Sequence, residues 1–263
     1  MDAALHQQRG RPGLPAALHG SHVLPAPDGV ALTKVGAVLL DIEGTTTPID
    51  FVHKTLFGDA RARLGEFLQQ HWEDPEIQAD VTRLEAEHAI ESHLDTPSWH
   101  DDAPAVVAYV QWLMDQDRKS TGLKSLQGKI WEEGYRSGEL KGEVYPDVLP
   151  AMERWRAQGV DIAIFSSGSV QAQRSLFRSS VAGDLTRFIR AYFDTTTGPK
   201  RGPESYARIA AALECSPGEV LFVSDTVEEL DAARTAGMQT ALCVRDSGLG
   251  ATASEHRVIH GFE

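Results

Sequence analysis

Two carboxylates stand close together where a hydrophobic segment gives way to a glycine turn. Asp41 and Glu43 follow the apolar run 37–40 and precede Gly44. In an extended strand, residues i and i+2 project from the same face, so if the strand continues through position 43 both acids can address one small ligand. This arrangement is typical of a phosphoryl-transfer site. Taken alone, the same pair is equally typical of a turn-capping aspartate with a solvated neighbour.

A second polar cluster follows the buried hydrophobic run 160–165. Ser166, Ser167 and Gly168 stand between this run and a predicted helix that begins near residue 169. Backbone N–H groups at the start of a helix, together with a hydroxyl donor, form an anion-binding site. An ordinary serine N-cap explains the same residues without any ligand.

A lysine ends the polar loop 195–200, just before a predicted helix over 203–214. The ammonium group of Lys200 can neutralise a phosphate and keep an attacking carboxylate ionised. Most lysines are only solvated surface charges, so this residue indicates a site only in combination with the others.

A third hydrophobic run, 219–223, leads to Asp225, and Glu229 follows in the first turn of a predicted helix. Mg²⁺ prefers oxygen ligands and keeps several waters, so one or two carboxylates suit it. Acids near a helix N-terminus also stabilise the helix dipole without a metal. The repetition of this pattern favours a functional site over these structural explanations. Three buried strands each deliver polar side chains to one edge of a parallel sheet, where open α/β sheets bind ligands.

The elements that must position these residues fall into two regions. From residue 51 to about 140 the hydrophobic periodicity predicts only helices, over 51–72, 75–94, 103–119 and 123–140. After residue 146 helices and strands alternate, which predicts a parallel α/β sheet. The predicted strands are 160–165, 190–193, 219–223, 239–244 and 257–259, and the predicted helices are 147–158, 169–180, 203–214 and 227–236.

The first strand, 36–41, cannot bury both of its faces alone and must join the same sheet. We therefore predict an α/β fold with three layers, a parallel-sheet core formed by 35–50 and 141–263, and an inserted all-helical cap over 51–140. Residues 1–34 are rich in Pro, Gly, Ala and His without periodicity, and we interpret them as a flexible extension.

Composition narrows the class of partner. The chain has 263 residues, 25 basic and 38 acidic, and a net charge of −13, which opposes binding to nucleic acid or anionic membranes. Cys215 and Cys243 lack metal-ligand spacing, so we expect buried thiols rather than a needed disulfide. With no apolar stretch of about 20 residues and no secretory signal, we expect a soluble, cytoplasmic protein.

Taken in order, these segments resemble the haloacid dehalogenase (HAD) superfamily over residues 36–244. In that superfamily the second acid is usually Asp, whereas this chain has Glu43. The strings at 41–52, 165–173 and 192–200 look like those of the enolase-phosphatases, the acireductone synthases of methionine salvage. Pro199 and the extension 1–34 depart from that pattern.

The resemblance implies a Mg²⁺-dependent, bifunctional enzyme. It would enolise 2,3-diketo-5-methylthiopentyl-1-phosphate and then remove its phosphate, giving acireductone, 1,2-dihydroxy-3-keto-5-methylthiopentene. We expect this small phosphorylated diketone as the partner, with no nucleic acid and no membrane, and we expect a monomer.

The resemblance also implies roles by position. Metal-site residues would be Asp41, Glu43 and Asp225, with Glu229 in a supporting position. Phosphate-binding residues would be Ser166, Ser167, Gly168 and Lys200. Asp41 would attack phosphorus, Lys200 would support catalysis, and Glu43 would act as acid and base and is our candidate for the enolisation base.

Two other functions fit the same residues. One is a general Mg²⁺-dependent phosphatase of this superfamily that acts on small molecules without an enolase step. The other is a non-catalytic phosphate-binding module, although an intact set of acids and a large helical insertion count against it.

Overall fold

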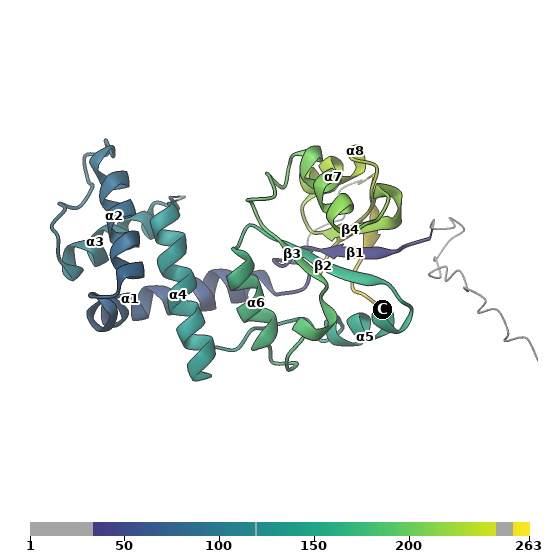
Figure 1. Cartoon of the computed structure of the whole chain (residues 1–263), viewed down its shortest axis with the longest axis horizontal. Helices are drawn as coiled ribbons and strands as arrows, with labels where there is room; N and C mark the ends of the chain where they lie inside the picture. Colours follow the sequence, from purple (N-terminus) through teal and green to yellow (C-terminus); the bar gives the residue numbers. More distant parts are fainter. Residues whose placement is uncertain (1–33, 119, 246–254) are drawn as a thin grey trace, which may run out of the picture.

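The computed structural model describes residues 34–118, 120–245 and 255–263. Within these residues six strands form one parallel sheet in the order β3-β2-β1-β4-β5-β6 (Figure 1). The strands are β1 (Ala37–Leu40), β2 (Asp161–Phe165), β3 (Ala191–Phe193), β4 (Val220–Ser224), β5 (Gln239–Cys243) and β6 (Arg257–Ile259). The predicted parallel α/β sheet is confirmed, and the strand before Asp41 lies in its middle.

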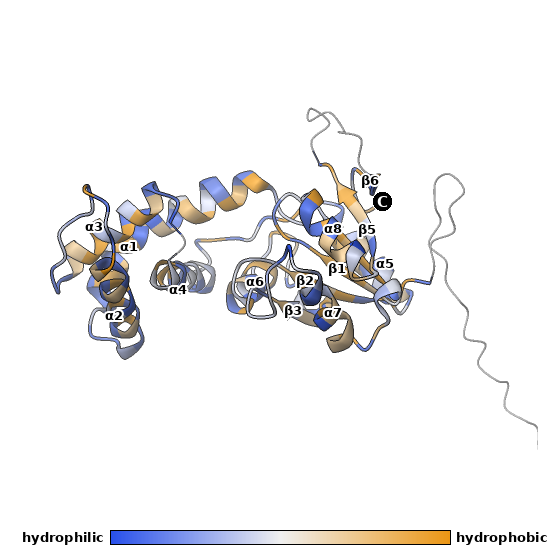
Figure 2. Cartoon of the chain, turned by 90° about the horizontal axis from the view of Figure 1, so that it is seen from above, coloured by the Kyte–Doolittle hydropathy of each residue, from blue (hydrophilic) through white to orange (hydrophobic). Residues whose placement is uncertain are grey.

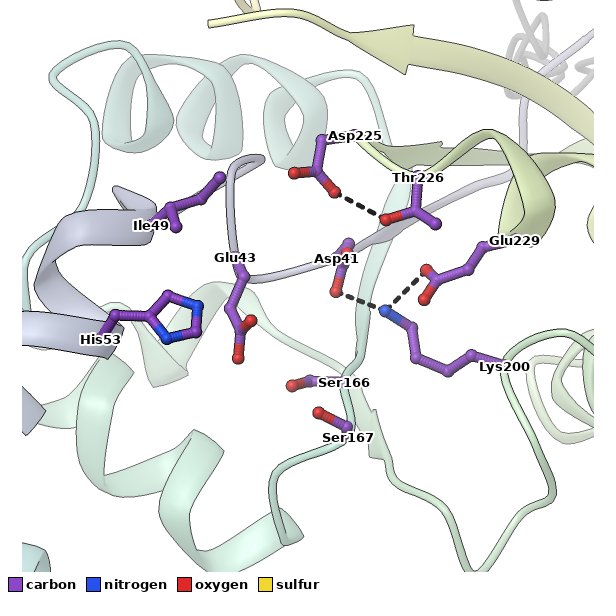
Figure 3. A pocket seen from close by; sticks show the side chains of 10 residues that line it. All are labelled: Asp41, Glu43, Ile49, His53, Ser166, Ser167, Lys200, Asp225, Thr226 and Glu229. Carbon is purple, nitrogen blue, oxygen red and sulfur yellow. Dashed lines mark hydrogen bonds and ion pairs between the residues drawn. The ribbon is translucent and has the colours of Figure 1, made fainter. Parts of the chain in front are cut away.

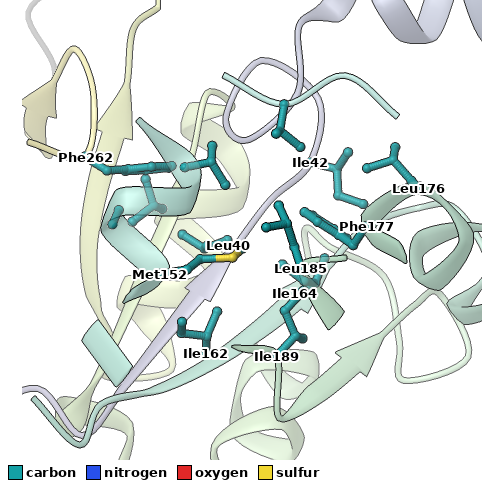
Figure 4. Close-up of a cluster of buried hydrophobic side chains, with 14 of the residues drawn as sticks. Leu40, Ile42, Met152, Ile162, Ile164, Leu176, Phe177, Leu185, Ile189 and Phe262 are labelled. Atoms are coloured by element: carbon teal, nitrogen blue, oxygen red, sulfur yellow. The ribbon is translucent and has the colours of Figure 1, made fainter. Parts of the chain in front are cut away.

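Helices cover both faces of the sheet and make three layers. They are α5 (Val148–Ala157), α6 (Val170–Arg178), α7 (Pro203–Ala212) and α8 (Val227–Thr235). Side chains alternate along a strand, so odd and even positions of β1 and β2 enter different cores. Leu40 and Ile164 pack with α5 and α6 (Figure 4), whereas Leu39 and Phe165 pack with α7 and α8.

Between β1 and α5 the chain forms a helical insertion. It consists of the π-helix η1 (Phe51–Leu56) followed by α1 (Phe57–His71), α2 (Pro75–Ala89), α3 (Ala103–Asp115) and α4 (Thr121–Ser137). The last four helices enclose a separate hydrophobic cluster, which includes Leu64, Leu84 and Leu126. Figure 1 shows them beside the sheet rather than on it, and Figure 2 shows the polar and apolar sides of α1.

Strand β1 ends at Leu40, so Asp41 and Glu43 do not share one strand face as the sequence argument required. A tight turn brings them together instead. The backbone N–H groups of Thr45, Thr46 and Thr47 all donate to the carbonyl of Ile42, at 2.9–3.2 Å. A buried turn, rather than the alternation of side chains along a strand, therefore places Asp41 and Glu43 close together.

Cys215 and Cys243 are both free; Cys243 is buried as predicted, whereas Cys215 is only partly buried. The extension 1–34 lies outside the described residues except for Lys34. Among the residues that are described, we find no helix with the length and apolar character needed to span a bilayer.

Candidate active site

A pocket of about 190 Å³ opens at the carboxyl edge of the sheet (Figure 3). The residues that line it are Asp41, Glu43, Ile49, His53, Ser166, Ser167, Lys200, Asp225, Thr226 and Glu229. Every site residue predicted from the sequence is among them except Gly168. The four separate segments therefore meet at one place, whereas the roles assigned to their residues stay predictions.

Asp41 is the most buried of the four pocket acids, with 4% of its surface exposed. Its Oδ1 accepts hydrogen bonds from the backbone N–H of Ile42, at 2.8 Å, and from Lys200 Nζ, at 2.7 Å. Its Oδ2 faces the hydroxyl of Ser224 at 3.2 Å. These contacts fix the carboxylate in one orientation.

Lys200 joins two acids from different elements. Its Nζ lies 2.7 Å from Asp41 Oδ1 and 2.7 Å from Glu229 Oε2. The loop behind it is held by α7, since the Tyr206 hydroxyl donates to the Lys200 carbonyl at 2.6 Å. Burial would lower the pKa of this ammonium, but Asp41 and Glu229 more than offset that effect and raise it. Lys200 is thus a fixed positive charge in the pocket.

Gly44 allows the turn after Asp41 to approach β4 closely. Its φ is +66°, and a Cβ at this position would lie 2.1 Å from Asp225 Oδ2. The Asp225 carboxylate also accepts a hydrogen bond from the Thr226 hydroxyl at 3.0 Å. Only glycine fits such a conformation and such a contact without a shift of its neighbours.

The segment after β2 brings Ser166 and Ser167 to the pocket and leads into α6. The N–H of Gly168 donates to Ser166 Oγ at 3.2 Å, so Gly168 supports the serine rather than lining the pocket. Gln173 of α6 holds this segment, because its Nε2 donates to the carbonyls of Gly168, at 2.7 Å, and Phe193, at 2.8 Å. The Ser169 side chain caps α6 by accepting from the N–H of Ala172.

The pocket carries an excess of acid. Of the ten lining residues four are carboxylic acids and one is a lysine. Burial, followed by repulsion from Asp41, raises the pKa of Glu43 and of Asp225, and the same two effects raise that of Glu229 to about 7. Negative charge is therefore crowded here, and a cation would relieve it.

Arg245 connects the turn after Asp41 to Asp147, the residue before α5. Its guanidinium donates to the Thr45 carbonyl at 2.6 and 3.0 Å and to the Asp147 carboxylate at 2.7 and 2.9 Å. The same group stacks over Tyr145 and Phe262, with centroid distances of 4.2 and 4.6 Å. A planar guanidinium can serve both purposes at once, so this residue braces the turn that follows Asp41.

Three pocket residues were not singled out in the sequence. Thr226 follows Asp225 directly, so its position next to a predicted site residue could have identified it. Ile49 and His53 come from the start of the helical insertion and lie four positions apart. A single isoleucine or histidine gives no pattern, and only the path of the chain after Thr47 brings them to the pocket.

The comparisons with known proteins agree with this geometry. The family model of haloacid dehalogenase-like hydrolases matches residues 35–237. The enolase-phosphatase E1 of Synechococcus elongatus is 56% identical, over 87% of this chain and 97% of its own. That of Sorangium cellulosum is 50% identical, over 86% and 95%.

A solved structure is also similar. The UTR4 protein of Saccharomyces cerevisiae shares 34% identity and a TM-score of 0.71, covering 87% of this chain and 99% of its own. Matches of this identity and coverage establish membership of a family and not only a shared fold. The chain belongs to the haloacid dehalogenase-like hydrolases and, within them, to the enolase-phosphatases.

Proposed function

We propose that this protein is a bifunctional enzyme that enolises 2,3-diketo-5-methylthiopentyl-1-phosphate and then releases its phosphate, giving acireductone. The observation that carries the proposal is the meeting of Asp41, Ser166, Lys200 and Asp225 in one pocket at the carboxyl edge of the sheet. The relatives described above bear the name enolase-phosphatase, which supports the additional enolisation step.

In the phosphatase step Asp41 attacks phosphorus in line, the bond from phosphorus to the substrate oxygen breaks, and water later hydrolyses the aspartyl-phosphate. Lys200, 2.7 Å from Asp41, offsets the charge of the transferred group. Ser166 and Ser167 bind its oxygens, supported by Gly168. Glu43, whose pKa burial raises, is suited to protonate the leaving oxygen and then to activate water.

The donor set also fits Mg²⁺. No group of three or more His, Cys, Asp or Glu side chains among the described residues forms a metal site by itself. Mg²⁺ usually keeps several waters and needs one or two carboxylates with a substrate phosphate. Asp41 and Asp225 would supply these oxygens, with Glu43 beside them and Glu229 in support. The ion, when bound, neutralises charge on the phosphoryl oxygens.

In the enolisation step Glu43 removes a proton from the carbon that carries the phosphate. The carbon next to it is a carbonyl carbon, so the electron pair can move onto the carbonyl oxygen. Glu43 lies between the turn and the helical insertion, on the side of the pocket away from Lys200 (Figure 3).

We further propose the domain division given by the sequence, with residues 35–50 and 141–263 as the core and 51–140 as a cap that closes over the substrate. We also propose two further properties of the protein, that it is a monomer and that it is located in the cytoplasm. Sedimentation velocity tests the first of these two properties, and cell fractionation tests the second.

The experiment is turnover of the diketone phosphate by wild type and by Asp41→Asn. Wild type should give a transient enol absorbance before phosphate appears, and Asp41→Asn should keep its fold and release no phosphate. Asp50→Asn is the control, because Asp50 is exposed and forms a surface ion pair with Lys54 away from the pocket lining. Phosphate release without a transient enol absorbance would identify a general phosphatase. The absence of both signals would identify a non-catalytic binding module.

A further inference from the structure

His53 stands at the opposite end of the pocket from Lys200. It is exposed and lines the pocket, and Figure 3 shows its ring facing the Glu43 carboxylate, which lies between it and Asp41. The ring contacts Phe57, with centroids 5.8 Å apart. Neither ring nitrogen has a hydrogen-bond partner within the described part of the chain. The imidazole is therefore available to a ligand.

The other lining side chains leave few donors for this end of the pocket. Ionised carboxylates only accept, and Ile49 has no polar group. Lys200 already binds Asp41 and Glu229, and the Thr226 hydroxyl donates to Asp225. Ser166 and Ser167 also line the pocket, and the function proposed above assigns them to the phosphate oxygens. An imidazole keeps at least one N–H in either protonation state.

The backbone around His53 is unusual and is held in place. Residues Phe51–Leu56 form a π-helix, a rare conformation that often marks functional sites. The helix is anchored from α4, because Trp131 Nε1 donates to the Leu56 carbonyl at 2.8 Å. The Trp131 ring also packs on Phe57, with centroids 5.9 Å apart. Two aromatic residues thus fix the segment that presents His53 to the pocket.

We propose that His53 is a catalytic residue of the enolisation step and donates a hydrogen bond to the carbonyl oxygen that becomes the enolate. This assignment rests on the function proposed above. With the phosphate at Asp41 and Lys200, the adjacent carbonyl extends toward Glu43 and His53. The isoleucine one turn earlier, Ile49, is 46% exposed and offers the nearby apolar surface for the rest of the substrate.

The atoms balance without any further reactant. Glu43 takes the proton from the carbon that carries the phosphate, and the C–H electron pair forms the new carbon–carbon double bond. The carbonyl electron pair moves to oxygen, where the His53 N–H stabilises the charge. The proton on Glu43 then moves to that oxygen, which leaves the enol and restores the carboxylate.

The test compares His53→Phe with His53→Gln, which retains an N–H donor. Loss of one such donor typically lowers the rate by about 100-fold or more. His53→Phe should therefore lower kcat for enolisation about 100-fold, with KM changed less than about threefold. Phosphate release from an aryl phosphate, which has no carbonyl, should stay within about threefold. His53→Gln should recover at least tenfold of the loss.

Lys54→Ala is the matched control, since Lys54 lies on the same π-helix and pairs with Asp50 on the surface. It should leave both activities unchanged. If wild type does not enolise the diketone phosphate, the proposed function fails and this assignment fails with it. If wild type enolises but His53→Phe does so equally well, only the assignment fails. Equal loss of both activities would also overturn it and make His53 structural.

Discussion

Replacing Gly44 with alanine tests whether activity depends on the present position of the Asp225 carboxylate. The new Cβ would lie 2.1 Å from Asp225 Oδ2 and 2.8 Å from Asp225 Cγ. Because non-bonded atoms need more than about 3 Å, the carboxylate must move by roughly 1 Å or the turn must open. Either change separates the turn after Asp41 from Asp225, the acid that follows β4.

The magnitude has two parts. A φ of +66° costs a non-glycine residue about 1–2 kcal/mol, which lowers the thermal midpoint by roughly 2–8 °C. A misplacement of about 1 Å in a catalytic constellation costs about 100-fold in rate. We therefore expect a modest loss of stability, a loss of kcat of about 100-fold, and a higher Mg²⁺ concentration for half-maximal activity.

Gly159→Ala separates the two effects. Gly159 has a φ of +73°, and a Cβ there meets no atom within 4 Å. This variant should lose similar stability and no activity. Phosphate release is measured at saturating substrate over a series of Mg²⁺ concentrations, and thermal midpoints are measured by circular dichroism. Full activity in Gly44→Ala would refute the argument, as would equal losses of activity in both variants.

Three other predictions follow from the described contacts. Arg245→Met should lower the free energy of unfolding in urea by about 1–3 kcal/mol, because it removes the guanidinium from the partly buried Asp147 carboxylate and from the Thr45 carbonyl, although the Phe262 N–H still donates to Asp147. Chelation of divalent cations should stop phosphate release while the thermal midpoint hardly moves, and added Mg²⁺ should restore it. Burial raises the pKa of Cys243 to about 11, so at pH 8 a thiol reagent should modify Cys215 first and Cys243 only on unfolding. For the same reason the contribution of the buried Cys243 thiol to stability is fully present below pH about 9 and is lost as pH rises toward 11.

Much of the fold could be predicted from the sequence because its strands are buried on both faces and its helices are strongly periodic. The strand expected at 160–165 is β2 at Asp161–Phe165, and the helix expected at 169–180 is α6 at Val170–Arg178. Continuous apolar runs bounded by Gly, Ser and Asp leave few alternatives for such segments. The family resemblance is confirmed as well.

Features that depend on tertiary contacts were not predictable. The strand was expected to run to 41, but the turn donating to Ile42 ends it at Leu40. The Arg245 guanidinium donates to the Thr45 carbonyl, although the two residues lie about two hundred positions apart in the sequence. No local sequence pattern predicts such a contact. His53 lies on a π-helix that replaces the start of the helix predicted over 51–72, and only the path of the chain after Thr47 brings it to the pocket. The roles of the individual site residues stay predictions that the variants above test.

The central place of β1 in the sheet has a consequence for how the chain folds. Ala37 pairs with Asp161 on one side and Val220 on the other, so its partners are synthesised long after it. Helices α1–α4, by contrast, contact one another over short separations and can assemble early. We expect the helical insertion to fold before the sheet edge that carries the pocket has formed. Strand β1 then stays unpaired during synthesis until most of the polypeptide has left the ribosome.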